Sequence, residues 1–180
     1  MNHAALDSLS TSLRQLLADA SAAGAYQQLV VRTQQTQWPE AVRALNGLTA
    51  DAVFVAPVKR PDEARCALAG LWLYVDELDR AHRIVQEIPT PCGSFWHAVV
   101  HRREGDFSNS KYWYARCVDH PVARSLEPGG PALVDLVEEV ASLPPGDARR
   151  GRAIQLQWRE WELLFDHCAR AAVGDGGGRS

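Results

Sequence analysis

Residues 93–121 read GSFWHAVVHRREGDFSNSKYWYARCVDHP, a run in which aromatic, basic and acidic side chains follow one another closely. Ser94 suits a helix N-cap and Gly105 suits a helix end, which predicts one helix between them. A second helix is predicted from about 108 to 118, because the residue before Pro121 resists helical geometry. The side chains predicted to face the core are Trp96, Val99, Val100, Trp113 and Cys117.

The flanking sequence has the same helical periodicity. Leucines at three- and four-residue steps give an apolar stripe over 5–23, with Asp7 or Ser8 as its cap. Pro39 and Pro61 each begin a helix, because a proline in the first turn has no N–H to leave unpaired. The helices expected outside the opening run cover 5–23, 39–48, 61–75, 80–88, 132–143 and, after the cap Asp147, 147–172.

Two short segments have less regular patterns. Residues 26–34 fit a helix by spacing, although the pair Val30-Val31 also fits a strand; their helical neighbours favour a helix. Residues 52–58 are a short apolar run that fits an extended segment, but one such run makes no sheet. With about eight helices and short loops, we expect an all-α fold of antiparallel helical hairpins or an irregular helical bundle.

The length of 180 residues favours one domain, which we place at 1–173. The loop EPGGP at 127–131 is a potential sub-boundary within it, since proline and glycine interrupt the helical pattern there. The glycine-rich end GDGGGRS at 174–180 predicts a flexible tail.

The composition excludes several functional classes. A formal net charge of −3 at pH 7 argues against a nucleic-acid partner, which needs a clustered basic excess. There is no membrane-length apolar run and no signal peptide at the N-terminus, so we expect no membrane partner and a cytoplasmic location. The four cysteines form no CxxC pair, which favours buried thiols over two disulfides. No phosphate loop or nucleophile elbow is present, and the sequence therefore leans away from an enzyme.

One polar set in the opening run has a spacing suited to chemistry. On a helix, His97 and His101 lie one turn apart and Glu104 follows three residues later, so the three share a face at the edge of the buried stripe. Two imidazoles and a carboxylate in this order can bind a divalent metal such as zinc and leave an open position. Further ligands or supporting groups could come from His82, His120, Asp106 or Asp76.

The same residues also have a purely structural interpretation. His97 and His101 would then be half-buried and hydrogen-bonded to loop carbonyls, while Glu104 would pair with Arg102, Arg103 or Lys111. The adjacent pair Arg102-Arg103 is expected to form ion pairs with Glu104 and Asp106 rather than to contact phosphate.

Two weaker candidates lie beside this set. Cys92 precedes a predicted helix start and has His97 one turn further on, an arrangement that can activate a thiol. Tyr112, Trp113 and Tyr114 are consecutive and cannot all face the core, so Tyr112 is expected at the surface with Arg116, as a face for a ligand or partner.

Two consecutive segments repeat one arrangement: an apolar helix, an acidic turn, and a second helix that ends near proline. The turns are Asp76-Glu77 and Gly105-Asp106, each followed by a small residue with an apolar one four positions later, Ala81 with Val85 and Ser110 with Tyr114. Over about 62–121 the chain therefore resembles the tetratricopeptide repeat.

This resemblance implies a helical scaffold with a groove for a protein or peptide. The run 93–121 is also similar to a run in uncharacterised helical proteins, which assigns no role to any residue. The leading functional prediction is thus a protein- or peptide-binding scaffold, or a self-associating one that forms a homo-oligomer. The alternative is a metal- or small-ligand-binding protein that uses His97, His101 and Glu104, with or without catalysis.

Overall fold

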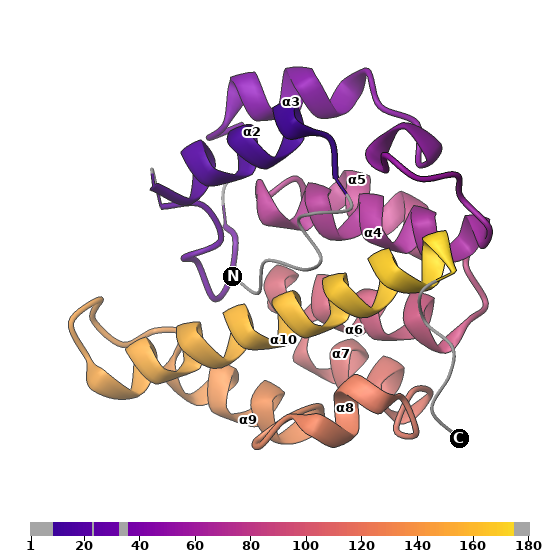
Figure 1. Cartoon of the computed structure of the whole chain (residues 1–180). Coiled ribbons are helices and arrows are strands. Elements are labelled where there is room, and N and C mark those ends of the chain that lie inside the picture. Colours follow the sequence, from indigo (N-terminus) through magenta and orange to yellow (C-terminus); the bar gives the residue numbers. More distant parts are fainter. Residues whose placement is uncertain (1–8, 23, 33–35, 175–180) are drawn as a thin grey trace.

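The computed structural model describes residues 9–22, 24–32 and 36–174, and within them the protein is all-helical (Figure 1). The predicted all-α class is confirmed. Apart from a 3₁₀ turn at Asp51–Val53, the described residues form nine α-helices. These are α2 (Thr11–Ala22), α3 (Pro39–Asn46), α4 (Pro61–Tyr74), α5 (Leu78–Val85), α6 (Pro91–Glu104), α7 (Phe107–Ala115), α8 (Pro121–Ser125), α9 (Pro131–Val140) and α10 (Ala148–Val173).

The helix starts follow from prolines and capping side chains. Five helices begin with proline, namely α3, α4, α6, α8 and α9. Asp147 caps α10 as predicted, because its carboxylate accepts the Arg149 N–H at 2.8 Å. The predicted cap Ser94 is wrong: Thr90 Oγ1 accepts the Gly93 N–H at 3.1 Å, so α6 begins at Pro91. Gly105 ends α6 with a left-handed φ of 83°.

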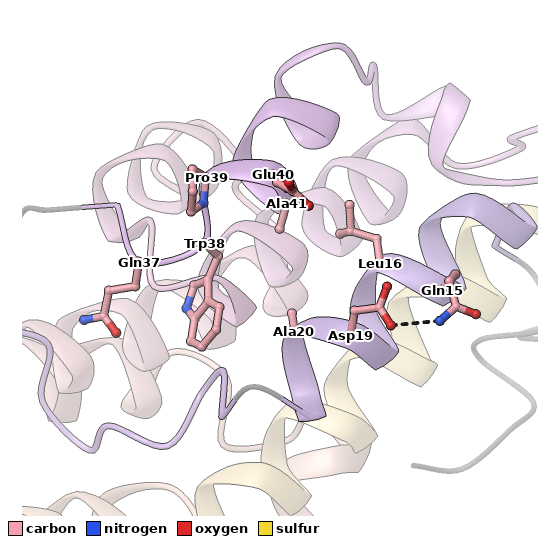
Figure 2. A pocket seen from close by; sticks show the side chains of 9 residues that line it. All are labelled: Gln15, Leu16, Asp19, Ala20, Gln37, Trp38, Pro39, Glu40 and Ala41. Atoms are coloured by element: carbon pink, nitrogen blue, oxygen red, sulfur yellow. Dashed lines mark hydrogen bonds between the residues drawn. The ribbon is translucent and has the colours of Figure 1, made fainter.

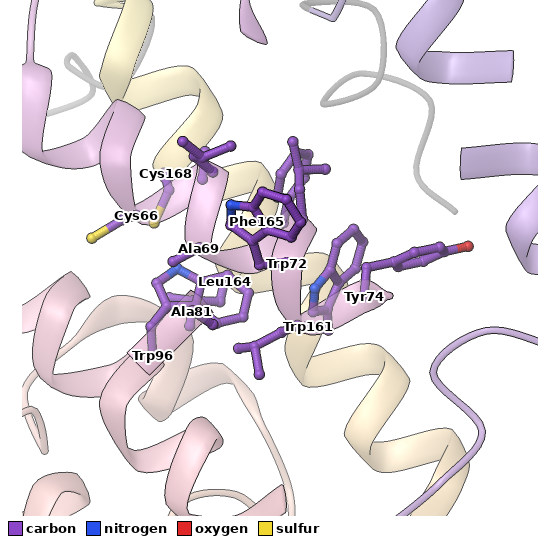
Figure 3. Close-up of a cluster of buried hydrophobic side chains, with 14 of the residues drawn as sticks. Cys66, Ala69, Trp72, Tyr74, Ala81, Trp96, Trp161, Leu164, Phe165 and Cys168 are labelled. Atoms are coloured by element: carbon purple, nitrogen blue, oxygen red, sulfur yellow. The ribbon is translucent and has the colours of Figure 1, made fainter. Parts of the chain in front are cut away.

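Helices α4, α6 and α10 meet in the centre of the molecule. Figure 1 shows α10 crossing the fold between α4 on one side and α9 and α8 on the other, and α10 contacts all three. Aromatic rings from these helices fill the space between them (Figure 3). Trp161 and Phe165 of α10 stack with ring centroids 4.8 Å apart, and the Trp161 indole N–H donates to the Gly70 carbonyl at 2.9 Å. A Cβ at Gly70 would lie 2.8 Å from the Trp96 ring, so this close approach requires glycine.

Residues 26–32 form a loop, and the helix predicted there is wrong. Tyr26 has a φ of 61° and is fully buried. The Arg103 guanidinium lies 4.1 Å above its ring, and the Arg103 carbonyl accepts the Val31 N–H at 2.8 Å. Tertiary contacts therefore satisfy a backbone that the local pattern would make helical. Residues 33–34 of that prediction lie outside the described residues.

One further segment differs from the prediction, and other predicted segments lie outside the described residues. Residues 51–53 form the 3₁₀ turn, and the extended run predicted at 52–58 is reduced to one isolated bridge between Leu9 and Phe54. Residues 5–8 and 175–180 lie outside the described residues. The domain bounds 1–173 and the sub-boundary at 127–131 stay predictions.

Two arginines pass through the interior, and the ion pairs expected for them with Glu104 and Asp106 are wrong. Arg102 donates to Glu160 of α10 at 2.5 Å and to the Tyr114 hydroxyl at 2.7 Å. Arg103 donates to Asp76 at 2.5 Å and to the Leu73 carbonyl at 2.7 Å. Both arginines are fully buried, so their charges are matched inside the fold.

Across residues 9–22, 24–32 and 36–174, none of the helices combines the length and apolar character that a membrane span requires.

Candidate metal centre

Helices α5 and α6 bring three histidines and a glutamate together. The predicted residues His97, His101 and Glu104 lie along α6, and His82 faces them from α5. His97 Nε2 lies 2.9 Å from His82 Nε2, and one ligand atom from each of the three histidines falls within 4.8 Å of the others. Glu104 contacts His82 and His101, with its two oxygens 3.1 Å and 2.9 Å from their Nδ1 atoms.

This cluster, which we call the His82 cluster (His82, His97, His101 and Glu104), lies at the edge of the core. His97 and His101 are buried, whereas the side chains of His82 and Glu104 are 29% and 28% exposed. Solvent therefore reaches the cluster at His82 and Glu104. His97 and His101 were expected to be half-buried and bonded to loop carbonyls; they are instead buried and bonded to the side chains of His82, Glu104 and Asn109.

Ring stacking fixes the orientation of the buried histidines. The His97 ring lies between Trp113, 4.0 Å away with planes inclined by 20°, and His101, 4.8 Å away with planes inclined by 18°. The His82 ring stands nearly perpendicular to both, at 66° and 84°. The predicted core residue Trp113 is thus a wall of the site.

Hydrogen bonds determine which ring nitrogens carry protons. A carboxylate only accepts, so Glu104 requires N–H at the Nδ1 atoms of His82 and His101. When these two rings are neutral, their lone pairs lie on Nε2. Consistent with this, the Asn109 side-chain amide donates to His101 Nε2 at 3.1 Å. In the neutral cluster His97 donates its Nε2 proton to His82 Nε2, so the lone pair of His97 lies on Nδ1.

The electrostatics keep the His97 ring neutral and the Glu104 carboxylate charged. Burial opposes ionisation of Glu104, but hydrogen bonds from His101 and His82 outweigh it and lower the Glu104 pKa to about 2. Burial, with the neighbouring His101 and His82, lowers the His97 pKa to about 4. The hydrogen bond to Glu104 raises the pKa of His82.

The ion pairs expected around Glu104 are replaced by these contacts. Lys111 instead pairs with Asp135 at 2.7 Å, on the other side of α7. Among the other supporting groups considered, Asp76 binds Arg103 and Asp106 caps α7, so neither joins the cluster. Asn109 was not predicted from the sequence. It lies eight residues after His101 and on the next helix, and helical spacing predicts contacts only within one helix.

A second group, which we call the Cys92 cluster, contains Cys92, His120 and His167. Cys92 Sγ lies 3.3 Å from His120 Nε2, and the rings of His120 and His167 are 4.6 Å apart. The histidine beside Cys92 is therefore His120, not His97. Burial, and then His167, lowers the His120 pKa to about 4, whereas the hydrogen bond to Cys92 raises the pKa of His167.

Two other surface features lie apart from the clusters, namely the predicted partner face and a hollow. Tyr112 is exposed, and Arg116 donates to its hydroxyl at 3.0 Å, so these two predicted residues are together at the surface. A hollow of about 560 Å³ lies between α2 and α3, with Leu16, Trp38 and Ala41 among its walls (Figure 2).

Comparison with known proteins gives no family for this chain. No protein-family model, no curated protein and no solved structure matches it. The functional argument therefore rests on the geometry of its own side chains.

Proposed function

We propose that this protein binds one divalent transition-metal ion of the zinc type through His82, His97 and His101. The observation that carries the proposal is the convergence of three ring nitrogens while Glu104 holds the far nitrogen of two of these rings. A carboxylate on the second nitrogen of a metal-binding histidine fixes its tautomer and raises its basicity. Glu104 thus orients ligands, in place of the direct ligand role that its spacing suggested.

The distances fit an imidazole-bound ion after a small adjustment. Two imidazole nitrogens on one tetrahedral zinc, each about 2.0–2.1 Å from the metal, lie about 3.3 Å apart. His82 and His97 are already at 2.9 Å, and the three ligand atoms lie within 4.8 Å of one another, so the fit needs a slight opening of α5 from α6 and a shift of His101 toward the ion. His97 shifts its proton from Nε2 to Nδ1, and His101 exchanges the Asn109 amide for the ion. Three neutral imidazoles leave a fourth position for water or a small ligand.

Metal analysis of protein purified without an affinity tag tests this proposal. We expect about one zinc or nickel ion per chain in the wild type and none in His97→Ala/His101→Ala. The matched control His120→Gln/His167→Gln removes two histidines elsewhere and keeps the ion. Circular dichroism confirms that each variant is folded.

Two further measurements sharpen the test. Glu104→Gln is expected to weaken zinc binding by about 10–100-fold, since an outer-shell partner is lost. Zinc at about 100 times its Kd contributes about 2.7 kcal/mol to the wild type and raises its melting temperature, while Mg²⁺ does not. A wild type with no stoichiometric metal and unchanged melting in zinc and nickel contradicts the proposal.

Peptide binding or self-association is the second candidate. The hollow between α2 and α3 favours it, because Trp38 and Leu16 offer an aromatic and an aliphatic contact there (Figure 2). Light scattering with wild type and Leu16→Glu tests for a dimer through this hollow. A cytoplasmic location fits both candidates, since all four cysteines are buried free thiols.

A further inference from the structure

A cavity of about 540 Å³ opens beside the Cys92 cluster, between the N-terminus of α6 and the α7–α8 connection. Cys92, His120 and His167 all line it, and so does a second thiol, Cys117. Cys92 itself is 6% exposed. A small molecule in this cavity therefore meets the Cys92 sulfur and both imidazoles.

The tautomer of His120 distinguishes this cluster from the His82 cluster. His120 caps α8, and its Nδ1 accepts the Val122 N–H at 3.2 Å. A neutral His120 must then carry its proton on Nε2, the nitrogen that lies 3.3 Å from Cys92 Sγ. This N–H points at the sulfur, so His120 is a hydrogen-bond donor to Cys92 and not a metal ligand in this arrangement.

The other groups around Cys92 suit a reacting thiol. His167 offers a ring nitrogen within 4.8 Å of the Cys92 sulfur and can accept its proton. Cys92 is the second residue of α6, where the helix dipole favours a negative charge on sulfur. The Cys168 thiol interacts with Cys92 as well, and that interaction, together with burial, raises the pKa of Cys92. The resting group is thus a thiol that depends on His167 for deprotonation.

We propose that Cys92 is a site of oxidation by a small hydroperoxide, with His167 as proton acceptor and Cys168 as the resolving thiol. The Cys92 sulfur attacks the terminal peroxide oxygen, and the O–O bond breaks. The proton held by His167 goes to the leaving oxygen, which departs as alcohol or water, and Cys92 becomes a sulfenic acid. The Cys168 sulfur then attacks Cys92, the S–O bond breaks, and water leaves as the disulfide forms. Two thiols supply the two electrons that the peroxide takes up.

Cys117 provides an internal comparison within the same cavity. Its thiol faces the carbonyls of Trp113 and Tyr114, at 3.6 Å and 3.5 Å. No imidazole hydrogen-bonds to it among the described residues. The two thiols are similarly buried, at 6% exposure for Cys92 and 3% for Cys117. Among the described residues, the imidazole contacts that could activate a thiol are present at Cys92 and absent at Cys117.

Hydrogen peroxide is the probe for the test, with remaining thiols alkylated and each cysteine quantified by mass spectrometry. In the folded wild type we expect a Cys92–Cys168 disulfide, formed at least about tenfold faster than any oxidation of Cys117. In Cys168→Ala, Cys92 is expected to accumulate as a sulfenic acid that dimedone traps. His167→Gln is expected to slow Cys92 oxidation about tenfold or more and to leave the Cys117 rate unchanged.

Several outcomes overturn the proposal. Equal rates for Cys92 and Cys117 remove the role of the imidazoles, and a Cys92 rate unaffected by His167→Gln removes the proton acceptor. A folded wild type whose Cys92 stays reduced in excess peroxide contradicts it directly. A metal ion retained in His97→Ala/His101→Ala but lost in Cys92→Ala assigns the cluster to metal binding instead.

Discussion

Glutamine in place of Glu160 would leave Arg102 charged and buried without an anion beside it. The three polar side chains there form a closed triangle: Arg102 donates to Glu160 at 2.5 Å and to Tyr114 at 2.7 Å, and Tyr114 donates to Glu160 at 2.6 Å. Arg102 and Glu160 are both 0% exposed. Among the described residues, Arg102 pairs with no other carboxylate. The substitution therefore removes the charge match and preserves the shape.

The expected loss is a large part of the stability of the fold. Removing one partner of a buried ion pair costs about 3–5 kcal/mol, because the other charge stays desolvated. We expect about 3 kcal/mol for Glu160→Gln, since the amide oxygen still accepts one hydrogen bond. A domain of this kind has a total of about 5–15 kcal/mol.

Urea unfolding followed by circular dichroism measures this loss as a lower midpoint at an unchanged slope. The matched control is Glu139→Gln, which breaks the Arg149–Glu139 pair, with side chains 59% and 64% exposed, and should cost less than about 1 kcal/mol. Replacing Arg102 and Glu160 together by methionine should recover most of the loss. A Glu160→Gln protein within about 1 kcal/mol of wild type would refute the reasoning.

Two further predictions concern glycines and acid. Gly93→Ala should destabilise α6 by more than about 2 kcal/mol, because the new Cβ would lie 2.2 Å from the Ile88 carbonyl oxygen; Gly151→Ala in α10, where the new Cβ meets nothing within 4 Å, should stabilise by about 0.5–1 kcal/mol. Thermal melts of the two variants should shift in opposite directions. In the folded protein the pKa of His120 is lowered to about 4, whereas in the unfolded chain it is about 6.5. As the pH falls, His120 is therefore protonated in the unfolded chain before the folded protein, and stability should fall between pH 7 and pH 5. Urea titrations should assign about 2 kcal/mol of this fall to His120, and a His120→Gln protein with the wild-type pH dependence would contradict the assignment.

Helix positions were largely predictable because their signals are local. Proline at a first turn, a capping aspartate and a terminal glycine act within one turn of the residues they affect, and Pro39, Pro61, Asp147 and Gly105 all mark the observed boundaries. The error at Ser94 arose because Thr90 and Ser94 are both suitable N-cap residues. Thr90 stands before a proline and caps the helix one turn earlier, so Ser94 lies inside it.

The interior charges were not predictable, because their partners are distant in sequence. Arg102 finds Glu160 on another helix, and Arg103 finds Asp76 and the loop that contains Tyr26. In the sequence the two arginines are next to Glu104 and Asp106, so ion pairs with these nearest carboxylates were predicted. The loop at 26–32 was missed for the same reason, since its conformation depends on Arg103 contacts across the fold.

The candidate sites show where periodicity stops being informative. Helical spacing brought His97, His101 and Glu104 to one face, and the fold adds His82 from α5. Spacing says nothing of tautomers, and the tautomers separate the two histidine clusters. Glu104 requires a proton on Nδ1 of His82 and His101, so in each neutral ring the lone pair that could bind a metal ion lies on Nε2. The Val122 N–H requires a lone pair on Nδ1 of His120, so a proton on Nε2 faces Cys92. The Glu104 carboxylate behind the imidazoles thus favours metal binding in the His82 cluster. The Val122 N–H behind the His120 imidazole favours thiol chemistry in the Cys92 cluster. Each cluster includes residues of α6, with Cys92 in its first turn and His97 and His101 farther along, so substitutions at different positions of this helix test the two proposals separately.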